Sequence, residues 1–108
     1  MLKEEDEKGK EIVEGVTLKI TLNVFRTGCD RKNFDILNSL PISVKELEKK
    51  FNLTKMPMNK RLNELEKCGL LKRDKYKGKV EQSNLGLQFL RIMDEIKKEV
   101  IKELPNLI

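Results

Sequence analysis

Three short stretches of the chain carry apolar residues at the three- and four-residue spacing of amphipathic helices. Asp30 can cap the first helix, which is expected to run through residues 31–40 and to end at Pro41. Ser43 can cap the second, and Glu46 three residues later completes a capping box. The apolar stripes of these two helices contain Phe34, Ile36, Leu37, Leu40, Val44, Leu47 and Phe51.

The third helix is expected to begin near Thr54, which can cap it, and to end at Gly69. Met58, Leu62 and Leu65 lie at i, i+4 and i+7, so they are predicted to face inward. At 100° per residue, the side chains that then point outward are Met56, Asn59, Lys60, Asn63 and Lys67.

A lysine-rich stretch, LLKRDKYKGKVEQS, predicts a β-hairpin with its tip near Lys77 and Gly78. After Ser83 a long helix is expected to run to about Glu103, before Pro105. Its wide apolar stripe contains Leu85, Phe89, Ile92, Met93, Ile96 and Val100. A stripe this wide exceeds what a small core can cover, which predicts a helix pair between two subunits.

The segment of residues 12–28 allows two interpretations. Val16, Leu18, Ile20, Leu22 and Val24 alternate with polar residues, which is the pattern of a half-buried strand. The alternative is a helix, because apolar residues of this segment also share one helical stripe and Gly28 could end it. We expect a strand. In either form this N-terminal element exposes an apolar face that the core or a partner subunit must cover, while residues 1–11 read as a charged, flexible tail that is at most weakly helical.

Composition removes several classes of function. Hydrophobic and charged residues each make up 38% of the 108 residues, and no apolar run approaches the roughly 20 residues that span a bilayer. The first residues lack the apolar core of a signal peptide, so a cytoplasmic location is expected. The chain has no histidine, and its two cysteines are not in a CxxC pair. We therefore expect no enzyme, no metal site and no cofactor.

The net charge of +5 is concentrated between about residues 54 and 80, and this charge alone fits a polyanionic partner and a solvated, lysine-rich surface equally well. Asparagine can read adenine through paired hydrogen bonds, and lysine can reach guanine or phosphate. In the hairpin, cations at every second position are expected on one strand face or around the tip, with no acid in register. The candidate DNA-binding residues are Thr54, Lys55, Asn59, Lys60, Asn63, Arg73, Lys75, Lys77 and Lys79.

The order of helix, helix, helix, basic hairpin and helix is that of a winged helix-turn-helix fold. Residues 30 to 90 also resemble the core of the ArsR, MarR and HxlR groups of prokaryotic transcription regulators. The passage RLNELEKCGLLKR is similar to their step from recognition helix into wing, and KVEQSNLGLQFL is similar to their wing end and following helix start, at Ser83, Asn84 and Gly86. The resemblance implies a homodimer that binds double-stranded DNA, with dimer contacts from terminal elements. The cysteine and histidine clusters of the metal-sensing members are absent, and no effector is indicated.

The sequence thus predicts a mostly α-helical chain with a small β-hairpin wing, a long C-terminal helix and an extra N-terminal element. The expected parts are a tail (1–11), the N-terminal element (12–28), a winged helix DNA-binding core (30–83) and a dimerisation helix (84–108). The candidate dimerisation residues are Phe89, Ile92, Met93, Ile96 and Val100. The alternatives to a transcription regulator are a winged helix protein–protein interaction module and a non-specific, chromatin-like DNA-binding protein.

Overall fold

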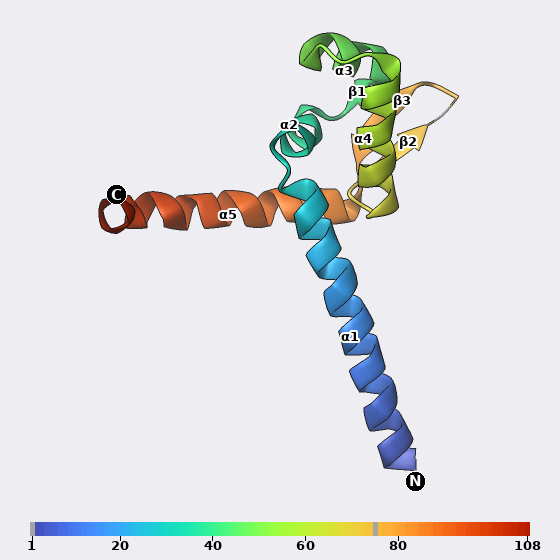
Figure 1. Ribbon diagram of the computed structural model, residues 1–108, viewed down its shortest axis with the longest axis vertical. Coiled ribbons are helices and arrows are strands. Elements are labelled where there is room, and N and C mark those ends of the chain that lie inside the picture. The colour runs from blue at the N-terminus through green and yellow to red at the C-terminus, as the bar shows by residue number, and fades with distance from the viewer. Residues whose placement is uncertain (1, 75) are drawn as a thin grey trace.

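The computed structural model describes residues 2–74 and 76–108 and contains two long helices, three short helices and a small antiparallel sheet that lies at one side of the short helices (Figure 1). The elements in chain order are α1 (Leu2–Gly28), α2 (Arg31–Ser39), β1 (Ile42–Ser43), α3 (Val44–Phe51), α4 (Lys55–Lys67), β2 (Leu71–Asp74), β3 (Lys79–Gln82) and α5 (Asn84–Leu107). The chain is therefore mostly helical with a small β component, as the sequence predicts.

For residues 12–28 the favoured strand is wrong and the alternative helix is confirmed, because the whole segment belongs to α1, which ends at Gly28. Residues 2–11, expected as a tail, form the first turns of the same helix. The alternating pattern misleads here because apolar side chains lie on more than one side of α1: Val16 and Ile20 share one side, and Leu18 and Leu22 lie on another. Along much of its length α1 has no sheet or core of its own chain to cover it, and both sides stay exposed.

The short helices begin and end where their capping residues predict. The side chain of Asp30 accepts a hydrogen bond from the backbone N–H of Asn33, and that of Ser43 accepts one from Glu46. Asn52 ends α3 in the left-handed conformation, and Gly69 follows α4 at a φ of +89°. Thr54 is the N-cap of α4, but within the described part of the chain its side chain makes no capping hydrogen bond.

The long C-terminal helix differs from the prediction at its end. It was expected to stop at about Glu103, whereas α5 continues through Pro105 to Leu107. A proline within a helix removes one backbone donor, yet the backbone of Ile108 still donates to the carbonyl of Leu104 beyond it.

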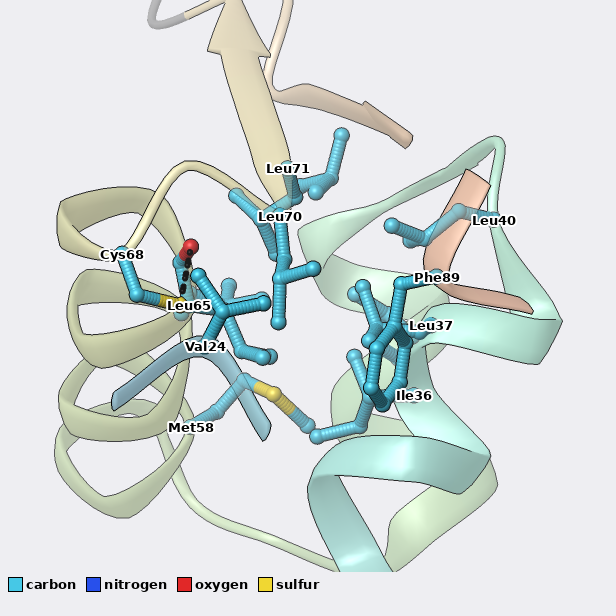
Figure 2. Packing of buried hydrophobic residues seen from close by; sticks show 13 residues of the cluster. Val24, Ile36, Leu37, Leu40, Met58, Leu65, Cys68, Leu70, Leu71 and Phe89 are labelled. Carbon is cyan, nitrogen blue, oxygen red and sulfur yellow. Dashed lines mark hydrogen bonds between the residues drawn. The ribbon is translucent and has the colours of Figure 1, made fainter. Parts of the chain in front are cut away.

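The core lies where α2, α3, α4 and the sheet meet the inner ends of α1 and α5. Met58, Leu62 and Leu65 of α4 are fully buried, which confirms their predicted inward orientation. Figure 2 shows Val24 of α1 and Phe89 of α5 in the same cluster as the leucines of the short helices and of β2. The two long helices are thus attached to the core by their inner ends.

The sheet holds the β2–β3 hairpin against the helices. Its strand order is β1-β3-β2, and Ile42 of β1 pairs with Val80 of β3. At the hairpin tip, the carbonyl of Gly78 accepts a hydrogen bond from the backbone N–H of Val44. At the other end of the hairpin, the side-chain amide of Gln82 donates to the carbonyls of Leu37 and Leu40. The hairpin is therefore anchored at both ends rather than projecting as an isolated ribbon.

The outer parts of α1 and α5 extend away from the core in different directions (Figure 1). The chain exposes 8676 Å², whereas a globular protein of its 12.6 kDa mass exposes about 6,200 Å². Its radius of gyration is 17.7 Å, against about 13 Å for a compact chain of this length. The two helices account for this excess, and in the described residues neither is apolar enough over a sufficient length to cross a bilayer.

Candidate nucleic-acid interface

The outer face of α4, formed by Met56, Asn59, Lys60, Asn63 and Lys67, points away from the core as the helical wheel predicts. Lys60, Asn63 and Lys67 are exposed, while Asn59 at the edge nearest the hairpin is half-buried. Met56 is 83% exposed, a large apolar side chain within an otherwise polar surface. Thr54 and Lys55, at the start of the helix, are exposed as well. All the α4 candidates therefore lie either at the start of the helix or on its outer face.

The hairpin cations do not share one face, which corrects the sequence-based expectation. In the β2–β3 register, Arg73 lies opposite Val80 and Asp74 lies opposite Lys79. Since Val80 is buried, Arg73 is on the inner face of the hairpin and Lys79 is on the outer face. An acid is also in register with Lys79, contrary to the expectation that none would be. The number of residues in the turn decides this arrangement, and the every-second-residue pattern does not reveal it.

The hairpin tip presents polar and aromatic groups to solvent. The carboxylate of Asp74 accepts hydrogen bonds from the backbone N–H groups of Tyr76 and Lys77, at 3.1 and 3.2 Å, which closes the turn. Tyr76 and Lys77 are exposed. The candidate Lys75 lies outside the described residues. A compact tip of this kind can reach a nucleic-acid backbone or groove.

The guanidinium of Arg73 connects the hairpin to α4. Its Nη1 donates to Oδ1 of Asn63 at 3.0 Å, and its Nη2 donates to Oδ1 of Asn59 at 3.2 Å. The structure thus joins three of the candidate DNA-binding residues in one hydrogen-bonded group. Neither of these contacts is evident from the sequence.

A second arginine, which the sequence analysis did not single out, holds α4 from its other side. Nη1 of Arg61 lies 2.8 Å from Oδ1 of Asp30 and 3.0 Å from Oδ1 of Asn33. Asn33 is almost fully buried and donates to the carbonyl of Thr27 at 3.0 Å, so the network reaches the end of α1. The hydrogen bond from Asn33 N–H, together with Arg61, lowers the pKa of the Asp30 carboxyl.

No protein-family model, curated protein or solved structure matches the chain. The chemistry of α4, the hairpin and the two long helices is therefore what indicates a function.

The candidate dimerisation residues divide into two groups. Phe89 is 2% exposed and packs edge-to-face against Phe25 at 5.4 Å, so in this chain it belongs to the core. Ile92, Ile96 and Val100 are exposed farther along α5, and Met93 is half-buried against the core. Exposed apolar residues of α1, which were not candidates by residue, include Ile12, Val13, Val16, Leu18, Ile20 and Leu22.

In the described residues, no three histidine, cysteine, aspartate or glutamate side chains lie close enough to share a metal ion. Cys68 is buried, and burial raises the pKa of its thiol, which disfavours the reactive thiolate. What the arrangement offers instead is a set of exposed cations and amides on α4 beside an anchored hairpin.

Proposed function

We propose that this chain is a winged helix transcription regulator that binds double-stranded DNA with α4 in the major groove. The observation that carries the proposal is the outer face of α4, where Lys60, Asn63 and Lys67 are exposed on a helix whose opposite face is fully buried. A helix of this kind can enter the major groove and present hydrogen-bonding groups to base edges while lysines meet phosphates.

The arrangement of the neighbouring elements supports the same function. Helices α3 and α4 are separated by a three-residue turn, Asn52–Thr54, which is the connection length of helix-turn-helix units. The β2–β3 hairpin follows α4 directly and lies beside it, and Lys77 is exposed at its tip. In the proposed complex the hairpin acts as the wing and contacts the backbone or the minor groove.

A homodimer is part of the proposal, because the single chain leaves too much apolar surface exposed. Its surface exceeds that of a compact protein of the same mass by about 2,500 Å². Burying half of that excess on each of two chains gives about 2,500 Å² in total, which is within the range of obligate homodimers. The exposed apolar residues of α1 and of the outer part of α5 would form this interface. Two α4 helices would then meet successive turns of one DNA face.

The test is fluorescence anisotropy with random-sequence duplex, titrated from low to physiological salt. The proposal expects binding that weakens steeply with salt, followed by selection of a preferred sequence from a random pool. Absence of binding at low salt would overturn the proposal in favour of a protein–protein interaction module. Binding without any sequence preference would favour a chromatin-like protein.

A further inference from the structure

Arg73 of β2 forms hydrogen bonds with two side chains of α4. It lies on the inner face of β2, opposite the buried Val80, and its two terminal nitrogens each donate to a different asparagine of α4. Asn59 and Asn63 are four residues apart, so their side chains lie one turn apart on the same side of the helix. One planar guanidinium therefore spans both amides.

The chemistry of arginine fixes how these amides are turned. A guanidinium has only donors, so each asparagine must direct its carbonyl oxygen toward Arg73. The amide nitrogen, with its two donors, is then held in one orientation. An asparagine distinguishes adenine only when it presents oxygen and nitrogen in a defined order, and a flipped amide presents the reverse. The orientation of the two amides therefore decides which base edges they can match.

We propose that Arg73 is a positioning residue, which orients Asn59 and Asn63 and thereby determines which bases α4 distinguishes, without itself contacting a base. The inference rests on the proposed DNA binding. The pairing of β3 with β1 and the Gly78–Val44 hydrogen bond hold the hairpin in place, so the backbone of Arg73 keeps a fixed position. Side chains that are ordered before binding lose less conformational entropy when they bind, so the same contact also favours affinity for the preferred sequence.

The first test uses the protein without DNA. Arg73→Lys keeps the positive charge, but a single ammonium cannot replace a planar fork that bonds two amides at once. NMR order parameters of the Asn59 and Asn63 side-chain amides should be high in the wild-type protein and fall in the variant. Lys72→Arg is the control, because Lys72 is exposed and pairs with Glu81 on the outer face. Equal order in wild type and Arg73→Lys would overturn the positioning role.

The second test measures discrimination, as the ratio of affinities for a duplex selected by the wild-type protein and for a scrambled duplex of the same composition. Arg73→Lys should lower this ratio about tenfold, since a paired asparagine–base contact contributes a discrimination of that order. Affinity for the scrambled duplex and the salt dependence should stay unchanged, because the charge is retained. A direct phosphate contact by Arg73 would instead leave the ratio unchanged.

A double-mutant cycle separates action through the asparagines from direct action on DNA. The double variant Asn59→Ala/Asn63→Ala should lose discrimination to a similar extent, and adding Arg73→Lys to it should cause no further loss. A further loss would overturn the inference. Wild-type protein that binds no duplex, or all duplexes equally, would overturn the proposed regulator itself. Normal wild-type discrimination that is unchanged in Arg73→Lys would overturn the role of Arg73 alone.

Discussion

At the scale of single residues, Asp30 combines two stabilising contacts. Its carboxylate caps α2 through the N–H of Asn33 and forms an ion pair with Arg61 of α4. Asp30→Ala removes both, and we expect a loss of about 1 kcal/mol in the free energy of unfolding at neutral pH. Asp30→Asn keeps a capping oxygen and should lose less. Urea denaturation of both variants beside the wild type measures the difference, and equal stability of all three would contradict the assignment.

The lowered pKa of Asp30 also predicts a dependence on pH. Because the pKa is lower in the folded protein than in the unfolded chain, the unfolded state binds more protons in acid. The stabilisation is complete above the unfolded value of about 3.9 and is lost as the pH falls through the folded value. Asp30→Asn has no such titration, so its stability should fall less between about pH 5 and pH 2. Parallel curves for variant and wild type would exclude this contribution.

Gly86 provides a further prediction at the scale of single residues. A Cβ at this position would collide with the backbone carbonyl of Leu70, which cannot move aside as a flexible side chain could. Gly86→Ala should therefore lower the free energy of unfolding by about 2 kcal/mol or more. Gly15→Ala is the matched control within a helix, because nothing lies within 4 Å of its added Cβ. The control should be neutral or gain up to about 1 kcal/mol. Thermal unfolding compares the two, and equal effects would refute the steric argument.

At the scale of elements, the outer face of α4 should tolerate substitution structurally but not functionally. Lys60 is exposed, so Lys60→Glu should leave the melting temperature nearly unchanged. Its affinity for duplex DNA should fall tenfold or more, in line with about 1–3 kcal/mol for a base or phosphate contact. Lys8→Glu on the distant part of α1 makes the same charge change and should bind almost as the wild type does. Unchanged affinity of Lys60→Glu would exclude α4 as the DNA-reading helix.

Helices whose apolar residues follow one helical stripe could be predicted from the sequence, whereas α1, whose apolar residues lie on more than one side, could not. The stripe of Met58, Leu62 and Leu65 meets the core, so the sequence defines α4 and its outer face. In α1 the apolar residues Val16 and Leu18 meet no core of this chain, and their alternation imitates a strand. The contacts of Arg61 with Asp30 and of Arg73 with Asn59 join residues far apart in the sequence. Helix packing and hairpin register bring them together, and local patterns do not contain that information.

At the scale of the whole molecule, the two long helices carry the apolar surface that the core of this chain does not cover. Exposed apolar residues lie along the middle of α1 and the outer half of α5, where Val16 is 53% and Ile96 is 55% exposed. Exposed apolar surfaces of this size commonly mark sites of protein–protein contact. The proposed dimer therefore depends on α1 as well as on α5, whereas the core residue Phe89 contributes to the fold of each chain instead.

This dependence can be tested by placing a charge on either helix. Ile96→Glu and Val16→Glu should each convert the dimer to monomers in sedimentation velocity, because an unpaired carboxylate would be buried at the interface. The α2–α4 core and its hairpin should remain folded, since neither residue belongs to the core cluster. Arg91→Glu introduces an acid on the side of α5 that faces away from Ile96 and Val100, and it should leave the dimer intact. Dimers that persist in Ile96→Glu but not in Val16→Glu would assign the interface to α1. Dimers that persist in both variants would exclude the long helices as the interface. A variant that has become monomeric should also bind a duplex with two half-sites less tightly than the wild type does. In the monomer the two contacts with DNA are independent, whereas in the dimer they are linked.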